Sequence, residues 1–232
     1  MLQTLPLVLF IVMTELSIGA FTVLFALDWR NQVKRSFLIT YGLIYIVLTG
    51  LTYLFQQGFS TPDLLNTFNQ LDKNWTGYIT LPLVLFLVLM LPYNVLLWLD
   101  KKAGVDGKEE GRSSRSTLRL LRMIFGGLAV LAGLATLFVI AMIYRPIESA
   151  NFAGVFTVAS FFAAALALGG VMTAMWLGHW YLVTPALSEK PLQFATTLVL
   201  IGVLAQVLFA VTAGPTTTYA NNSAATPTVT AT

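Results

Sequence analysis

The chain contains no cysteine, only one histidine (His179) and few charges, since Asp, Glu, Lys and Arg make up 10% of its 232 residues. Without cysteine it cannot form disulfides, ligate an iron–sulfur cluster, build a thiolate zinc site or use a cysteine nucleophile. A lone histidine also excludes a bis-histidine haem within one copy. Soluble domains carry about 25% charged residues, so the shortage of charge excludes a soluble protein with a large core.

Apolar residues take the place of the missing charge. Hydrophobic residues make up 57% of the chain, and the mean hydropathy is +0.79. This composition is typical of a polytopic membrane protein and argues against a secreted enzyme or a disordered chain. Lipids are therefore expected as partners. The net charge is only +3, so nucleic acid is not expected as a partner.

Six long apolar stretches predict the fold class. A helix needs roughly 20 mainly apolar residues to cross about 30 Å of hydrocarbon. Because backbone polar groups must be paired inside lipid, stretches of this length predict helices. We therefore expect an all-α protein, a transmembrane bundle with six spans at 5–27, 36–55, 77–99, 120–144, 153–178 and 191–213.

Basic residues lie mainly on one side of these spans. The 28–35 loop, the 100–122 segment and Lys190 together hold 11 of the 13 Lys and Arg residues, leaving Lys73 and Arg145 on the other side. Basic loops are retained in the cytoplasm. We therefore predict that both termini are extracytoplasmic and that the protein lies in the bacterial inner (plasma) membrane.

The chain divides into a transmembrane domain over 1–213 and a tail over 214–232. The tail is rich in Thr, Ala and Pro and has no charge, which is typical of a flexible segment. Within the domain, Leu5–Phe10 recurs letter for letter as Leu81–Phe86. The recurrence indicates either chance similarity of leucine-rich helices or hairpin repeats at 5–55 and 77–144, with 153–213 as a third, divergent pair.

Glu15 lies about ten residues into the first span, which is ~15 Å at 1.5 Å per residue, and hence near the bilayer midplane. Carboxyl groups at this depth usually face the bundle and belong to a pathway, a proton relay or a ligand site. No Lys or Arg lies in the middle of another span, so we expect Glu15 to be protonated or paired with another subunit. The structural alternative is a neutral Glu15 that is hydrogen-bonded to Asn94, Gln206 or a hydroxyl.

Asn94 and Gln206 are amides within the third and sixth spans. Pro92 removes one backbone hydrogen bond and is expected to kink the third helix beside Asn94. A kink beside an amide favours a ligand notch, and an interhelical hydrogen bond is the alternative. The same two interpretations apply to Gln206.

Trp176, His179, Trp180 and Tyr181 form a cluster where the fifth span reaches the membrane surface. Trp and Tyr gather at membrane interfaces without any ligand, which explains the three aromatic residues. A neutral imidazole can ligate haem or a chlorophyll magnesium, or hydrogen-bond a quinone carbonyl. His179 is therefore a ligand or proton candidate, and its alternative is a satisfied polar group.

Small residues recur every four positions on two helices and predict close helix packing, within the chain or with other membrane subunits. Phosphate-binding loops, HExxH motifs and serine-nucleophile elbows are absent from the sequence. We therefore expect no catalytic residue and no metal site, and at most a non-catalytic role in an oxidoreductase complex. The packing residues are Gly170, Ala174 and Gly178 on one helix, and Ala129 and Gly133 on the other.

The first helix, Leu5–Phe10 followed by Glu15, Gly19, Ala20 and Phe21, resembles the opening of the DmsC/NrfD-type membrane anchors. The resemblance covers about a tenth of the chain, and the bundle of that family has more than six helices. Those anchors exchange electrons with quinol and contain no haem of their own. The resemblance implies that Glu15 lies near a quinol or proton site.

Three functions fit the sequence. The first is an integral subunit of an electron-transfer or photosynthetic complex, with a quinone, or a pigment or haem shared with a partner subunit, and a proton path through Glu15. The second is a small ion-coupled transporter or channel with Glu15 as the coupling site. The third is a membrane scaffold or assembly protein, in which Glu15 and His179 are satisfied polar groups.

Overall fold

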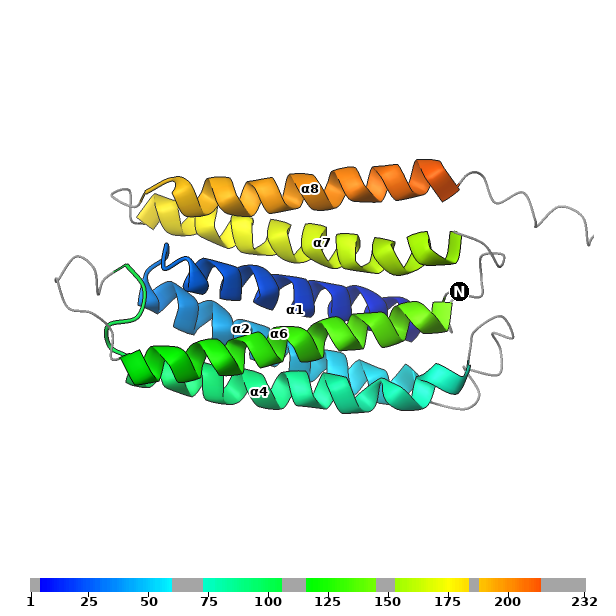
Figure 1. The fold of residues 1–232 in the computed structure, drawn as a ribbon, viewed down its shortest axis with the longest axis horizontal. Helices are drawn as coiled ribbons and strands as arrows, with labels where there is room; N and C mark the ends of the chain where they lie inside the picture. The colour runs from blue at the N-terminus through cyan, green and yellow to red at the C-terminus, as the bar shows by residue number, and fades with distance from the viewer. Residues whose placement is uncertain (1–4, 60–72, 106–115, 145–152, 184–187, 214–232) are drawn as a thin grey trace, which may run out of the picture.

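The computed structural model describes residues 5–59, 73–105, 116–144, 153–183 and 188–213. Six long helices run side by side in a bundle (Figure 1), and each is long and apolar enough to cross a membrane. A short 3-10 helix, η2 (Lys73–Tyr78), precedes the third of them. The six are α1 (Leu5–Trp29), α2 (Arg35–Phe59), α4 (Thr80–Leu99), α6 (Ser116–Tyr144), α7 (Ala153–Val183) and α8 (Lys190–Ala213).

The predicted fold class is confirmed, because the described part of the chain is a bundle of six such helices without a strand. Three helices extend well beyond their predicted spans. α2 continues to Phe59, beyond the predicted end at 55, and α7 continues to Val183, beyond the predicted end at 178. α6 begins at Ser116, before the predicted start at 120. Pro185 follows soon after in the sequence, and the residue before a proline disfavours helix. The direction of the helices across the membrane stays a prediction, and the 214–232 tail lies outside the described residues.

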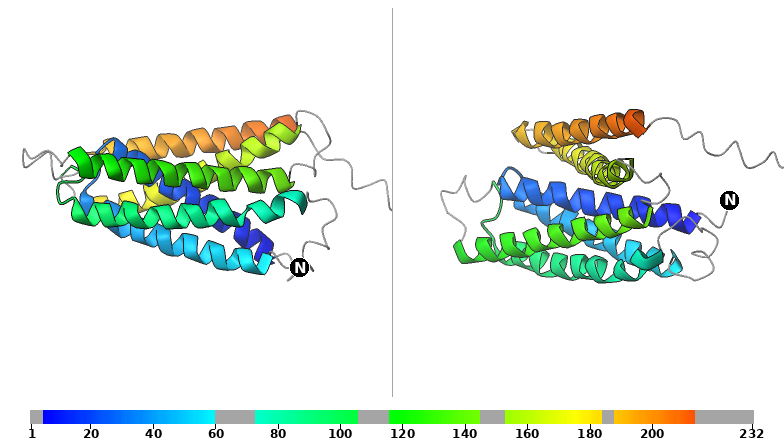
Figure 2. Two further views of the ribbon diagram at one scale, coloured as in Figure 1. Left: turned by 60° about the horizontal axis from the view of Figure 1, so that its bottom comes forward. Right: turned by 45° about the vertical axis from the view of Figure 1, so that its right-hand side comes forward.

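α1 occupies the centre of the bundle. It packs against α2, α6 and α7, while α4 packs against both α2 and α6. These contacts make a four-helix unit of α1, α2, α4 and α6. α7 lies on the opposite side of α1, and α8 packs mainly on α7, so the last two helices form a separate layer (Figure 2). α7 therefore contacts the four-helix unit mainly through α1.

Glycine permits backbone contact between α1 and α7. A Cβ on Gly19 would overlap the carbonyl oxygen of Ala165, and a Cβ on Gly169 would overlap the backbone of α1 at Gly19 and Ala20. Small residues at such crossings let two helix backbones approach closely in a membrane. The crossing therefore fixes the α7–α8 layer against α1, just one helical turn from Glu15.

The α1–α7 crossing generates the first prediction. We expect Gly19→Ala to lower the free energy of unfolding by about 1–3 kcal/mol, which is the usual cost of forcing extra volume into a packed site. Thermal or denaturant unfolding of the purified protein in detergent micelles measures the change. Gly50→Ala is the matched control, because a Cβ on Gly50 of α2 meets no atom within 4 Å. Equal stability of the two variants would contradict the close crossing.

Candidate functional site

Glu15 is buried in the middle of α1, with an exposed fraction of 8%. Residues four apart share a helix face, so Glu15 lies on the same face as Gly19, which contacts Ala165 of α7. The neighbouring hydroxyls of Thr14 and Ser17 donate to carbonyls of their own helix at 2.6 and 3.1 Å. Within the described residues, the Glu15 carboxyl forms neither a hydrogen bond nor an ion pair.

The two amides expected as alternatives are bonded elsewhere. Asn94 Nδ2 donates to the carbonyl of Met90 in its own helix at 3.0 Å. Gln206 Nε2 donates to the carbonyl of Ser160 at 2.7 Å and thereby joins α8 to α7. Neither amide is hydrogen-bonded to Glu15, so the structure leaves this carboxyl without the partners that the structural alternative requires.

α4 continues through Pro92 as one helix from Thr80 to Leu99. Pro92 has no N–H, so the carbonyl of Val88 lacks its usual helical partner. The Oδ1 atom of Asn94 is buried and has no hydrogen-bond partner in the described residues. A Cβ on Gly42 would overlap this oxygen, so the Asn94 amide fills the space that glycine leaves on α2.

The two tryptophans of the predicted cluster face α2. The ring of Trp176 lies 5.2 Å from that of Tyr41, and the ring of Trp180 lies 5.7 Å from that of Phe37, between centroids. Both indole N–H groups are buried and have no acceptor in the described part of the chain. We call Phe37, Tyr41, Trp176 and Trp180 the aromatic cluster. It presents two hydrogen-bond donors that no described residue satisfies.

His179 and Tyr181 have different surroundings from the two tryptophans. His179 is exposed on α7 and takes no part in the aromatic cluster. The hydroxyl of Tyr181 donates to the carbonyl of Ser188, so this residue connects the end of α7 to the start of α8. The predicted cluster of four residues therefore splits, and only the two tryptophans belong to the aromatic cluster against α2.

A buried hydroxyl pair lies one turn deeper than the aromatic cluster. The hydroxyls of Tyr45 and Thr173 are 2.9 Å apart, and Thr173 Oγ1 also lies 3.4 Å from the carbonyl oxygen of Ala20. Tyr45 follows Tyr41 by one helical turn, and Thr173 precedes Trp176 by three residues. The pair therefore sits between the aromatic cluster and the level of Glu15.

The predicted packing residues of α7 contact different neighbours. A Cβ on Gly170 would lie 2.8 Å from a side-chain atom of Val199 in α8, whereas a Cβ on Gly178 meets no atom within 4 Å. Ala174 is partly buried against the main core. Gly169, which the four-residue spacing did not select, is the residue in backbone contact with α1. Gly169 and Gly170, which are adjacent in the sequence, thus contact two different helices.

The predicted packing residues of α6 face the centre of the bundle. Ala129 is fully buried, and a Cβ on Gly133 would lie 2.9 Å from a side-chain atom of Ile18 in α1. This face of α6 therefore packs within the chain.

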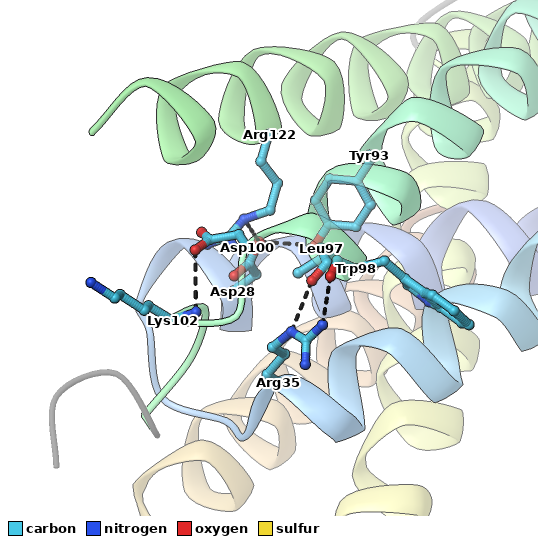
Figure 3. Close-up of polar contacts among 8 residues, drawn as sticks. All are labelled: Asp28, Arg35, Tyr93, Leu97, Trp98, Asp100, Lys102 and Arg122. Carbon is cyan, nitrogen blue, oxygen red and sulfur yellow. Dashed lines mark hydrogen bonds and ion pairs between the residues drawn. The ribbon is translucent and has the colours of Figure 1, made fainter. Parts of the chain in front are cut away.

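Three buried charges meet where α1 and α4 end and α6 begins (Figure 3). Arg122 Nε lies 3.1 Å from Asp28 Oδ2, and Arg122 Nη1 donates to Asp100 Oδ2 at 3.1 Å. The Tyr93 hydroxyl donates to the same Asp28 oxygen at 3.0 Å. Asp28, Asp100 and Arg122 are each at most 3% exposed. We call Asp28, Tyr93, Asp100 and Arg122 the Arg122 cluster. Its single guanidinium joins three helices.

A second arginine stabilises the same end of the bundle. Arg35 donates from Nε to the carbonyl of Leu97 at 2.9 Å and from Nη2 to that of Trp98 at 2.7 Å. The last carbonyls of a helix lack internal partners and carry partial negative charge. Arg35, at the start of α2, therefore caps the end of α4. Close by, the N–H of Val105 donates to the carbonyl of Val33 at 3.1 Å and ties the two connections together.

The pattern of basic residues places Arg122 among the loop charges, and it does not single out Asp28 or Asp100. One signal was available. Arg122 precedes Gly126 by four residues and Ala129 by seven, which places it on the same face of a helix as the packing residues. An arginine on the packing face of a span requires a buried acid as partner. The identity of that acid depends on which helix ends meet.

The described residues contain no group of three or more His, Cys, Asp and Glu side chains that could hold a metal ion. Comparisons with known protein families, with curated proteins and with solved structures return no match for this chain. Its function therefore has to follow from its own residues, among which Glu15 and the aromatic cluster carry unsatisfied polar groups. In the Arg122 cluster, by contrast, one guanidinium lies within 3.1 Å of both carboxyls and joins helix ends, which indicates a structural role.

The Arg122 cluster generates the second prediction. Arg122→Met leaves two buried carboxylates without a counter-charge, and removing one partner of a buried ion pair costs about 3–5 kcal/mol. We expect a loss of that size in denaturant unfolding of the protein in detergent. Arg119→Met is the control, because Arg119 is an exposed residue of the same helix turn.

Neutralising the two acids shows whether Arg122→Met is destabilised by the lost counter-charge or by the lost packing of the arginine stem. We expect Asp28→Asn and Asp100→Asn, added to Arg122→Met, to recover most of the lost stability, since uncharged replacements of a buried ion cluster are often nearly neutral. If the triple variant were as unstable as Arg122→Met alone, lost packing of the arginine stem would explain the effect instead.

Proposed function

We propose that this chain is an integral subunit of an electron-transfer complex in the plasma membrane, in which Glu15 exchanges a proton during quinol turnover. The observation that carries the proposal is the buried Glu15 carboxyl, which has no hydrogen bond or ion pair within the described residues. A carboxylate without a counter-charge is costly at this depth. A carboxyl that is neutral at rest can release its proton and then take up another, as a relay requires.

The aromatic cluster supports a quinone site. A quinone carbonyl is a hydrogen-bond acceptor, and the buried indole N–H groups of Trp176 and Trp180 lack one in the described residues. Aromatic rings pack well against a flat, apolar ring system. The Tyr45–Thr173 hydroxyl pair lies between this cluster and the level of Glu15. This buried hydroxyl pair is the polar feature from which a proton route between quinone and carboxyl would be built.

Quinol oxidation releases two electrons and two protons. In the proposed complex Glu15 first releases its own proton to water and then accepts one of the two quinol protons, and the other quinol proton passes to water. The two electrons pass to a redox centre of a partner subunit. A partner is required because this chain has no cysteine for an iron–sulfur cluster and only one histidine, which is exposed on α7.

Ion-coupled transport is the competing function. Many transporters place their binding sites at helices that are broken near the midplane. Pro92 is the break that the sequence suggests, and α4 runs through it without interruption. The continuous helix therefore favours the electron-transfer subunit over the transporter.

Co-purification tests the proposal directly. We expect the tagged chain, extracted from native membranes in mild detergent, to be recovered at fixed stoichiometry with cytochrome, iron–sulfur or molybdenum-containing subunits identified by mass spectrometry. Recovery of the chain alone, or as a homo-oligomer, would contradict the proposal. Gradient-driven uptake by proteoliposomes of the chain alone would then establish transport.

Glu15→Gln is the sharper test within the complex. A general acid–base group contributes about 10²–10⁴-fold to rate, so we expect quinol-dependent electron transfer to fall about 10²-fold while the complex assembles normally. The measurement is quinol oxidation by the purified complex, with subunit composition checked in parallel. Glu189→Gln is the matched control, because Glu189 is exposed at the start of α8. Unchanged turnover in Glu15→Gln would exclude the proton role.

A further inference from the structure

A groove of about 390 Å³ lies between α2 and α4. Leu43 of α2 and Leu91, Val95 and Trp98 of α4 line it, and each of these side chains is about half exposed or more. The groove therefore opens on the outer surface of the bundle, where a membrane protein meets lipid. Its volume falls within the range of about 300–1,000 Å³ that is usual for small-molecule sites.

The wall of the groove is apolar. Asn94 is its one polar lining residue, and the amide is turned inward, with Nδ2 on the Met90 carbonyl and Oδ1 against Gly42. A ligand in the groove therefore meets an almost entirely apolar wall. The matching ligand chemistry is a flexible chain of methylene groups.

One end of the groove is basic. Trp98 lies at that end, and its carbonyl oxygen accepts a hydrogen bond from Arg35 (Figure 3). Lys34 precedes Arg35, and Lys101 follows Trp98 by three residues. The nearest acid in the sequence, Asp100, is buried and paired with Arg122. It therefore leaves the positive charge of the lysines uncompensated at the surface.

We propose that this groove binds an anionic phospholipid, with one acyl chain between α2 and α4 and the phosphate beside Lys34, Arg35 and Lys101. Basic residues at the ends of membrane helices attract anionic headgroups, and tryptophan is favoured at the level of the headgroups. The apolar groove and the basic end are continuous, so one molecule satisfies both. The inference stands apart from the electron-transfer role of Glu15.

Binding of two lipids with identical acyl chains tests the proposal. The purified full chain in detergent micelles is titrated with phosphatidylglycerol or with phosphatidylcholine, and bound lipid is counted by native mass spectrometry. We expect one phosphatidylglycerol to bind about tenfold more tightly or better, given the attraction of two to three basic residues. Equal binding of the two lipids would overturn the proposal.

Blocking the groove tests where the lipid lies. Val95→Trp fills the groove and should lower phosphatidylglycerol binding about tenfold, whereas Val171→Trp should leave it unchanged. Val95 and Val171 are comparably exposed, at 57% and 51%, and Val171 lies on α7 outside the groove. Leu43→Trp blocks from the facing helix if Val95→Trp does not fold. Normal binding to a folded blocking variant would overturn the proposal.

Removing charge tests the headgroup. We expect Lys34→Gln with Lys101→Gln to weaken phosphatidylglycerol binding about tenfold without changing phosphatidylcholine binding, because only the anionic headgroup gains from the lysines. Glycerol phosphate, which lacks the acyl chains, should fail to displace the bound lipid. Displacement by glycerol phosphate would show that a free phosphate site, and not the groove, accounts for binding.

Discussion

The guanidinium of Arg122 holds together the ends of the helices on which the rest of the bundle depends. It reaches Asp28 at the end of α1 and Asp100 after α4, each at 3.1 Å, while Tyr93 adds a hydrogen bond to Asp28. Two buried carboxyls share one buried guanidinium, so the loss of Arg122 would leave both acids without a counter-charge at high cost. The cluster thus fixes α1, α4 and α6 relative to one another. Because α1 is central, it also determines where Glu15 lies.

Buried polar groups in this protein fall into two kinds. In the Arg122 cluster one guanidinium contacts two carboxyls across helices, and the amide of Gln206 is bonded to α7. Glu15 and the indole N–H groups of Trp176 and Trp180 lack such partners within the described residues. Paired groups stabilise the bundle, whereas unpaired groups in an apolar interior require a proton or a ligand. This contrast is the physical basis for assigning function to Glu15 and the aromatic cluster.

Much of the fold could be predicted from the sequence, and less of the candidate site. The depth of Glu15 in its span follows from hydropathy and helical rise alone, as does the existence of six helices. The pairing of Arg122 could not be predicted, since its acids lie on two other helices. The four-residue spacing selected Gly170 and missed Gly169, although Gly169 contacts α1 and Gly170 contacts α8. Spacing identifies a helix face, but it does not identify the neighbour on that face.

Inside the hydrocarbon of a membrane, backbone polar groups must be hydrogen-bonded within the protein, and the sequence by itself determined the features that follow from this requirement. Backbone groups must be paired within each span, which made the helices, their number and their approximate ends predictable. The tertiary structure alone decided that Glu15 is buried without a polar partner among the described residues and that Trp176 and Trp180 turn toward α2 while His179 is exposed. These outcomes depend on which helices pack side by side. Lipid solvates every apolar helix face equally well, so hydrophobicity does not select the neighbours; close packing and a few buried polar contacts do.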